Sequence, residues 1–450
     1  MNTNRRIPLF PLVFSSVLLL VVGQAQVKSS TLETWKATED AAASASKRAQ
    51  FAAAEKLLVA NQRLSETFSA KDARLPLTLF DLAQVYRAEG KYSDALPLYE
   101  RALEIYTRLY GHESTEFADV LNGEAELYKS LNDYAQAEQL LVRALAIRQR
   151  LLPLDSKDVA ESKNDLGEIY TAIGAFDKAE PLLLEALAIR KKKDAENADV
   201  AQSLLGLGLL NQQTGRAQQA ETLFREAVSI YGKTLGGEHP DYANALENLA
   251  LICQSRQDFL TAEPLLYRVL EIRKAVFGPQ HRDVAASLDN LAALNRAEGK
   301  PQEAAALYQQ AIAMWEKILG PDSPDLAADL NNLGAIYELD RDKQTAEPLF
   351  LRAMGLDEKA LGPESPEVGT DLNNLGLLYL LSKRYDESEK TYHRALAIRI
   401  KAFGESDPAV RETMSGYISA LRGLHRAAEA AQMEDRLRAT TKNQSVTPAK

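Results

Sequence analysis

The chain has 450 residues, of which 46% are hydrophobic and 26% are charged, with 23 glycines and 17 prolines. This length allows several globular domains or one repeat array, and the sparse glycine and proline favour long helices. A net charge of −10 argues against nucleic-acid binding, which requires a basic surface, and five histidines and one cysteine leave little for a metal site and nothing for an internal disulfide.

Residues 1–25 have the layout of a secretory signal peptide. Two arginines precede an uncharged, largely apolar run at residues 7–22, and small residues stand three and one positions before a possible cut after Ala25. The run is short for a helix that spans a bilayer. We therefore expect an exported protein, periplasmic or secreted, that begins near Gln26. The alternative is a protein that residues 7–22 anchor to the membrane.

A short segment recurs along the rest of the chain. Its clearest copy is TAEPLFLRAM, in which Ala346 is the second residue. Together with Ala346, the equivalent positions follow one another at spacings of 41 or 42 residues: Ala95, Ala137, Ala179, Ala220, Ala262, Ala304 and Ser388. Degenerate copies at Ala54 and Ala428 flank this series. A fixed period of this length indicates a stacked repeat array with atypical units at both ends.

The copies also predict the domain organisation. We expect a degenerate helix pair at residues 26–72, eight repeats at residues 73–404 and a capping helix pair at residues 405–439. The polar residues 440–450 are expected to be disordered.

Each unit predicts two helices. Apolar or small residues recur at i, i+3, i+4 and i+7, first at Leu330, Leu333, Gly334 and Tyr337 and then at Ala346, Leu349, Phe350 and Ala353. Links such as LGPDSP and LGPESP supply a glycine that ends the second helix, a serine that caps the next helix and a proline for its first turn. One pair cannot bury its apolar stripe, whereas stacked pairs can, so each repeat forms part of its neighbour's core.

This spacing resembles the tetratricopeptide repeat, and the 42-residue period with LGxxHPxxAxxLxNLA and AExLxxRALxI is similar to the kinesin light chain variety. The resemblance covers residues 31–439. It implies an all-α fold, a right-handed superhelical solenoid of stacked antiparallel helix pairs. It does not specify a function, because function depends on the site and not on the fold.

No group of residues points to catalysis or to a metal. His239 and His281 occupy the link position that holds the capping serines, so we expect a structural role for them. No two histidines have the spacing of a metal-binding pair. Cys253 takes a position that holds tyrosine in other repeats, and we expect a small buried side chain there. The sequence therefore predicts no enzyme and no cofactor.

One polar row lies beside the core positions of the first helices: Asn248, Asn290, Asn332 and Asn374. The resemblance implies that this position faces the concave groove, where peptide-binding members hold an extended peptide. An asparagine amide offers a donor and an acceptor, which match a peptide unit. The alternative is that these asparagines only form bonds between neighbouring helices.

A basic row lies near the ends of the second helices: Arg108, Arg150, Lys192, Lys233, Lys317, Lys359 and Lys401. Such a row could receive an acidic peptide or a terminal carboxylate. The alternative is that each cation compensates the negative end of its helix dipole.

From these patterns we expect an exported, non-enzymatic scaffold that binds a peptide or a partner protein in its concave groove. The asparagines would hold the backbone, and Lys233, Lys317, Lys359 and Lys401 would contact negative charge. The alternative is a structural spacer or assembly subunit of a cell-envelope complex, which would use its ends or its convex face.

Overall fold

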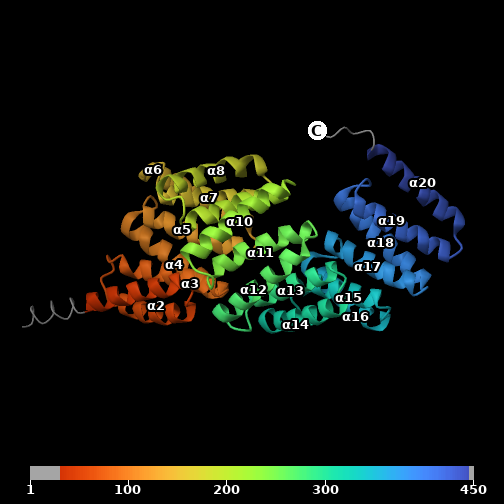
Figure 1. Cartoon of the computed structure of the whole chain (residues 1–450), viewed down its shortest axis with the longest axis horizontal. Helices are drawn as coiled ribbons and strands as arrows, with labels where there is room; N and C mark the ends of the chain where they lie inside the picture. Colours follow the sequence, from red (N-terminus) through yellow and green to blue (C-terminus); the bar gives the residue numbers. More distant parts are fainter. Residues whose placement is uncertain (1–30, 445–450) are drawn as a thin grey trace, which may run out of the picture. The chain divides into compact units, whose positions relative to one another are not determined.

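A computed structural model describes residues 31–444 (Figure 1). The signal peptide and the alternative anchor, both expected before Gln26, lie outside these residues. Within them the chain consists of helices and short links without any strand, as the sequence predicts. None of these helices is long and apolar enough to cross a bilayer. The described residues divide into two compact units, an N-terminal unit that ends at residue 252 and a C-terminal unit that begins at residue 253.

The N-terminal unit consists of helix pairs. A helix at residues 31–47 precedes α2 (Phe51–Ser65). Four regular pairs follow: α3 (Arg74–Ala88) with α4 (Tyr92–Tyr110), α5 (Thr115–Ser130) with α6 (Tyr134–Leu151), α7 (Lys157–Ala172) with α8 (Phe176–Lys193), and α9 (Ala198–Gln213) with α10 (Ala217–Thr234). The first helices also pack against one another, α3 on α5, α5 on α7 and α7 on α9, so they form one layer of the unit.

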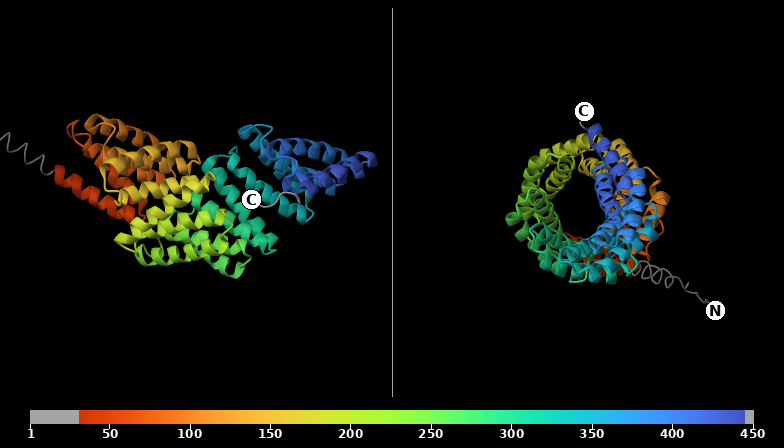
Figure 2. Two further views of the ribbon diagram at one scale, coloured as in Figure 1. Left: turned by 90° about the horizontal axis from the view of Figure 1, so that it is seen from above. Right: turned by 90° about the vertical axis from the view of Figure 1, so that its right-hand side faces the viewer.

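The C-terminal unit repeats this arrangement. The boundary between the units falls within α11 (Pro240–Ser255), and α12 (Phe259–Phe277) follows it. The remaining elements are α13 (Arg282–Ala297) with α14 (Pro301–Leu319), a short 3-10 turn η1 (Pro324–Leu326), α15 (Ala327–Leu339) with α16 (Lys343–Leu361), α17 (Pro366–Leu381) with α18 (Tyr385–Phe403), and α19 (Pro408–Gly423) with α20 (Ala427–Gln444). Within each unit the pairs stack in sequence order (Figure 2), which confirms the repeat interpretation.

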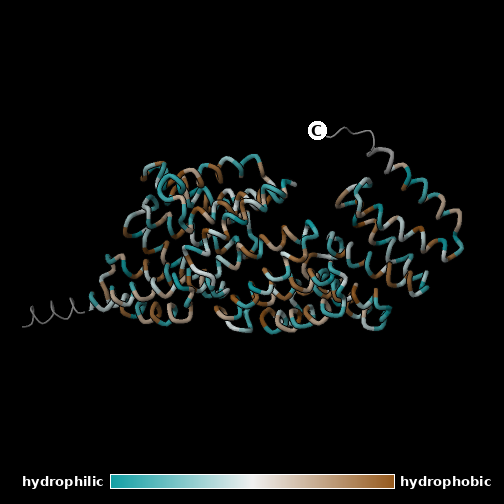
Figure 3. The backbone as a smooth tube through the Cα atoms, viewed as in Figure 1, coloured by the Kyte–Doolittle hydropathy of each residue, from teal (hydrophilic) through white to brown (hydrophobic). Residues whose placement is uncertain are grey.

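Hydrophobic and hydrophilic residues alternate along the helices, as amphipathic packing requires (Figure 3). Leu330 and Leu333 of α15 and Ala346 and Phe350 of α16 are all buried, at the spacing that the sequence predicts. Full burial of a leucine or phenylalanine side chain contributes about 1.5–3 kcal/mol to folding. The core of each repeat therefore comes from the recurring positions, shared with the next repeat.

The links end and start helices as predicted. Gly320 and Gly362 follow the second helices with φ angles of +89° and +90°, a conformation that side chains with a Cβ rarely adopt. Ser365 Oγ accepts a hydrogen bond from the main-chain nitrogen of Val368 at 3.3 Å. His281 Nδ1 accepts from Asp283 N at 3.2 Å in the same way, and His239 caps α11 at the same distance from Asp241 N, which confirms their structural role. Cys253 is buried, also as expected.

Glycine in the first helices allows a close approach of the second helix. A Cβ built on Gly334 would lie 2.8 Å from Cε1 of Phe350, a separation that real Cβ atoms do not show. Gly208 has the same relation to Phe224, at 2.3 Å. The small residue of the repeat pattern therefore makes room for a fully buried aromatic ring.

The C-terminal boundary differs from the expectation. The sequence predicts a capping pair to residue 439 and disorder from residue 440, whereas α20 continues to Gln444. Residues 440–444 are polar, and polarity alone does not end a helix in a stretch that contains no glycine or proline.

Candidate functional site

Buried arginines join successive repeats. They are at most 5% exposed and lie near the ends of second helices: Arg148, Arg190, Arg273 and Arg399. Each donates from Nη1 to a hydroxyl on the next first helix at 2.7–2.9 Å; the acceptors are Ser162, Ser203, Ser287 and Thr413. Each also donates to a main-chain carbonyl near the start of that helix. These bonds hold one repeat against the next.

Sequence reasoning did not single out this row. The sequence pattern that could have identified it is an arginine two residues before the position of the predicted basic row, followed 13 or 14 residues later by serine or threonine. Where Tyr231 replaces the arginine, Ala245 replaces the hydroxyl residue, and both side chains belong to one apolar cluster. This junction is thus apolar on both sides at the position where the four arginine junctions are polar.

Polar contacts also connect neighbouring first helices. Asn122 accepts from Ser162 Oγ at 2.9 Å, and Asn331 donates to Asp371 at 2.5 Å. These asparagines stand one position before the row that the sequence predicts to be functional. Both contacts are largely buried, so this inner row has a structural role.

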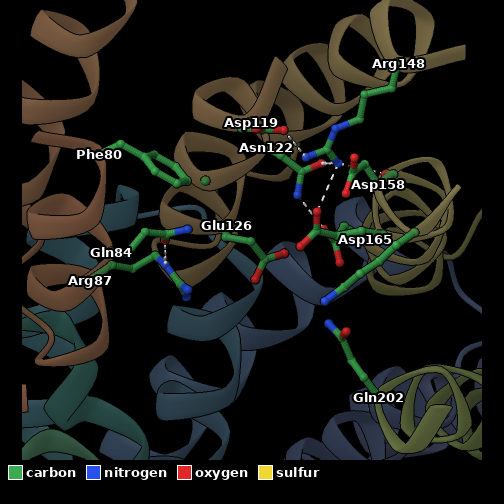
Figure 4. Close-up of a pocket in the computed structure, with 13 residues that line it drawn as sticks. Phe80, Gln84, Arg87, Asp119, Asn122, Glu126, Arg148, Asp158, Asp165 and Gln202 are labelled. Carbon is green, nitrogen blue, oxygen red and sulfur yellow. Dashed lines mark hydrogen bonds and ion pairs between the residues drawn. The ribbon is translucent and has the colours of Figure 1, made fainter. Parts of the chain in front are cut away.

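The first helices of the N-terminal unit line a pocket of about 410 Å³, here called the first-helix pocket (Figure 4). Four successive first helices contribute to it, with Arg87 on α3, Glu126 on α5, Glu161 on α7 and Gln202 on α9. The lining holds five carboxylates and three basic side chains. It is therefore a polar site in which carboxylates outnumber basic side chains. Gly123 and Asp165 of its lining occupy the repeat position of the predicted asparagine row, and sequence reasoning singled out none of the other lining residues.

At one end of the pocket, Arg148 holds two carboxylates. Its guanidinium lies 2.7 Å from Asp119 and 3.1 Å from Glu161, while the side chains of these acids remain 43% and 42% exposed. Partial desolvation by the surrounding protein raises the pKa of both carboxyls. Arg148 opposes this shift, and the negative charge of Asp119 adds to it at Glu161. Asn122 and Asp158 lie beside this group (Figure 4).

The floor of the pocket is also acidic. Asp165 is almost fully buried and accepts a hydrogen bond from Asn122 at 2.6 Å. Burial raises its pKa well above the ordinary range, with a further contribution from Glu126. Lys129 lies 3.0 Å from Glu126 and offsets part of this charge.

The opposite side of the pocket carries a cation. Arg87 of α3 lines it, and its Nε donates to Gln84 Oε1 at 3.2 Å. The same oxygen accepts from the hydroxyl of buried Tyr99 at 2.8 Å, so Gln84 positions Arg87 against the core. The pocket can therefore offer hydrogen-bond donors on one side and carboxylates on the other.

The predicted asparagine row is half-buried in both units, and its side chains make bonds within the chain. In the N-terminal unit, Asn248 donates to the main-chain oxygen of Asn244 at 2.9 Å. In the C-terminal unit, Asn332 accepts from Arg296 at 3.0 Å, and Asn374 is 3.4 Å from Asn331. Asn290 has the same half-buried environment. The amides are thus partly satisfied internally and partly accessible.

The predicted basic row lies on a different surface. Five of its members form an ion pair with a carboxylate that lies 37 residues earlier, in the preceding link, and the side chains of these five are 58–73% exposed. The pairs are Arg150 with Glu113, Lys192 with Asp155, Lys233 with Glu196, Lys359 with Asp322 and Lys401 with Glu364. Lys317 lacks this partner because Gln280 occupies the corresponding link position. None of the members in the N-terminal unit lines the first-helix pocket.

The C-terminal unit contains paired carboxyls at two junctions. Asp289 and Asp329 are hydrogen-bonded to each other, and Trp315 Nε1 donates to Asp289 at 2.9 Å. Asp357 and Asp371 form the second pair. Burial raises the pKa of Asp329 to about 8 and that of Asp371 to about 7, and the partner carboxyl adds to both shifts. Each pair therefore holds a proton near neutral pH.

A family model described as "Tetratricopeptide repeat" matches most of the chain; its overlapping matches are residues 37–108, 74–150, 116–192, 199–275, 241–317, 297–359, 330–388 and 367–442. No curated protein matches the chain.

Solved structures with similar folds include a Rap protein complexed with Competence and Sporulation Factor, with a TM-score of 0.52 and 13% identity over 91% of this chain and 99% of that chain. Others are BtubC (BKLC) from P. vanneervenii, with a TM-score of 0.45 and 25% identity over 51% and 92%, and a putative kinesin light chain from Podosopora anserina, with 0.42 and 23% over 47% and 100%.

Proposed function

The chain belongs to the tetratricopeptide repeat family, and on this premise we propose that it is a non-enzymatic scaffold that binds an extended segment of a partner protein. The observation that carries the proposal is the first-helix pocket, which four successive first helices line with polar side chains. Side chains that only stabilised the stack would be buried and paired, as Arg148 and Ser162 are. Asp119 and Glu161 keep accessible oxygens instead.

We also propose that the protein is exported, on the basis of the signal-peptide pattern at residues 1–25. N-terminal sequencing of the exported protein should find Gln26 or a close neighbour as the first residue. Recovery of Met1 from that fraction would contradict cleavage and favour the anchored alternative.

The pocket of the N-terminal unit and the four asparagines further along the chain are two candidates for the contact surface. We would photo-crosslink the exported fraction and compare three proteins: the wild type, a pocket variant with Arg87→Gln and Gln202→Ala, and a variant in which Asn248, Asn290, Asn332 and Asn374 are all alanine. Circular dichroism would confirm the same helix content. A partner that the wild type and the asparagine variant capture, and that the pocket variant loses, would support the pocket.

A second candidate function is a spacer or assembly subunit of a cell-envelope complex. The observation that favours it is the internal pairing of both predicted rows, since Lys192 and Lys359 bind link carboxylates and Asn248 bonds within its own helix. This function predicts that the pocket variant and the asparagine variant both capture the same partners as the wild type. Contacts would then map to the ends or to the outer faces of the second helices.

A further inference from the structure

We propose that the first-helix pocket selects a basic segment, with a lysine or arginine side chain bound between Asp119 and Glu161. This inference rests on the proposed function and deepens it, because it names the chemistry of the segment that the pocket takes.

The charges at this end of the pocket do not balance. Arg148 contacts both Asp119 and Glu161, and the carboxylate of Asp158 lines the same region. Lys157 also belongs to the lining, but it lies 3.3 Å from Asp199 of α9. Three carboxylates therefore lie around the guanidinium of Arg148. Arg190, which is not part of the lining, also acts on Glu161, so an excess of one negative charge remains that a bound cation would offset.

The two acids are placed to receive such a cation. Asp119 comes from α5 and Glu161 from α7, so they approach the pocket from adjacent first helices. Arg148 is 3% exposed behind them, whereas the acids are more than 40% exposed. A ligand ammonium or guanidinium can thus bind their accessible oxygens without displacing Arg148. Hydrogen bonds of this kind, between two charged groups, are stronger than neutral ones.

The protonation behaviour agrees with this arrangement. Desolvation by the surrounding protein raises the pKa of Asp119, Glu161 and Asp165, which means that this environment disfavours their negative charges. A ligand cation beside these carboxyls would lower their pKa and offset part of this penalty.

The rest of the pocket suits an extended main chain. Gln84 and Gln202 lie on different sides of the pocket (Figure 4). The oxygen of Gln84 accepts from Arg87, and that of Gln202 accepts from Arg190 at 3.1 Å. These bonds leave both amide NH₂ groups available to donate to peptide carbonyls, which do not depend on the ligand's side chains. The main chain would therefore contribute affinity, and the two acids would contribute selectivity.

The test uses the full chain and three dye-labelled seven-residue peptides that differ at two central positions, which hold lysine, glutamine or glutamate. Fluorescence anisotropy would give the dissociation constants at low and at physiological salt. We expect the lysine peptide to bind at least about tenfold tighter than the glutamine peptide, with the difference reduced by salt. The glutamate peptide should bind most weakly.

A matched pair of variants locates the effect. Asp119→Asn with Glu161→Gln removes two negative charges from the pocket and should weaken the lysine peptide by about tenfold or more. Glu104→Gln with Asp155→Asn removes two charges from exposed ion pairs outside the pocket, and it should change the affinity less than about twofold. As a check that needs no variant, a photoreactive lysine peptide on the wild type should label α5 and α7.

Equal binding of the three peptides, equal losses in the two variants, labelling outside α5 and α7, or no binding of any peptide would each overturn the inference. The proposed function fails separately. If partner capture still depends on the pocket while basic peptides show no preference, only the inference about charge is wrong. If capture is indifferent to the pocket, the proposed function fails as well.

Discussion

The buried arginine between repeats gives the sharpest prediction for stability. Arg190 is 4% exposed and donates to the carbonyl of Asp199 at 2.9 Å, to Ser203 Oγ at 2.7 Å and to Gln202 at 3.1 Å. Arg190→Met keeps most of the aliphatic stem and removes all three bonds. We therefore expect a loss that comes from hydrogen bonding and not from a cavity.

The magnitude follows from the acceptors that are left behind. Hydrogen bonds to a charged group contribute about 1.5–3 kcal/mol each, and Ser203 is fully buried, so its hydroxyl would lose its partner. The arginine also regains hydration when the protein unfolds, which offsets part of this sum. We expect a net loss of about 2–4 kcal/mol.

Lys192 is the matched control, because it lies two residues further along α8, is 73% exposed and pairs with Asp155 at 3.0 Å. Lys192→Met should cost less than about 1 kcal/mol. Urea denaturation followed by circular dichroism would measure both, and hydrogen exchange in α8 and α9 would show where the loss occurs, since repeat arrays do not always unfold as one unit. Equal losses of unfolding free energy in the two variants would refute the reasoning. Unchanged hydrogen exchange in α9 of Arg190→Met would refute it as well.

Three further predictions follow from packing, charge and protonation. Gly334→Ala should cost about 1–3 kcal/mol in urea denaturation, because its Cβ would meet the ring of Phe350, whereas Gly355→Ala in the next helix meets nothing within 4 Å and should be neutral or slightly stabilising. Lys359→Met should change the unfolding free energy by less than about 1 kcal/mol in low or high salt, because its ion pair is exposed. The pKa of Asp371 is about 7 in the folded protein and about 4 in the unfolded chain. The protonated carboxyl therefore stabilises the fold fully below pH ~4, and this contribution is lost as the pH rises through about 7. Between these pH values the urea midpoint of Asp371→Asn should fall less than that of the wild type.

Each of these has an outcome that would count against it. Equal unfolding free energies for Gly334→Ala and Gly355→Ala would show that the ring of Phe350 moves aside at little cost. A large, salt-dependent decrease in the unfolding free energy of Lys359→Met would show that the exposed ion pairs stabilise the fold more than their exposure predicts. A pH dependence of Asp371→Asn identical to that of the wild type would mean that other acids, such as Glu338, whose pKa burial raises to about 7, dominate the titration.

The candidate site shows how far a periodic pattern can guide site prediction. The sequence directs attention to Asn332 and Asn374, because identical residues recur at a fixed spacing. The structure shows that Asn331, one residue earlier, bonds the next first helix through Asp371. A period of 42 residues identifies equivalent positions in successive repeats. It does not identify the contact partner of such a position, because the partner lies about 40 residues away at a different position of the next repeat.

The basic row illustrates the same difference. Sequence alone shows a cation at the end of nearly every second helix, and it permits either a ligand contact or a helix-dipole effect. In the structure the partner of Lys359 is Asp322, which belongs to the preceding link. That pairing becomes visible when two segments 37 residues apart are brought together by stacking.

The sequence by itself determined the helices, their pairing and the periodic core. These depend on local chemistry and on short-range spacing, such as the apolar positions around Ala346, the glycine after each second helix and the serine or histidine that caps the next one. The tertiary structure decided which polar side chains are buried between repeats and which remain accessible in a pocket. Asp119, Arg148 and Glu161 come from three helices, and their charges act together because packing places the two carboxylates 2.7 Å and 3.1 Å from the guanidinium of Arg148.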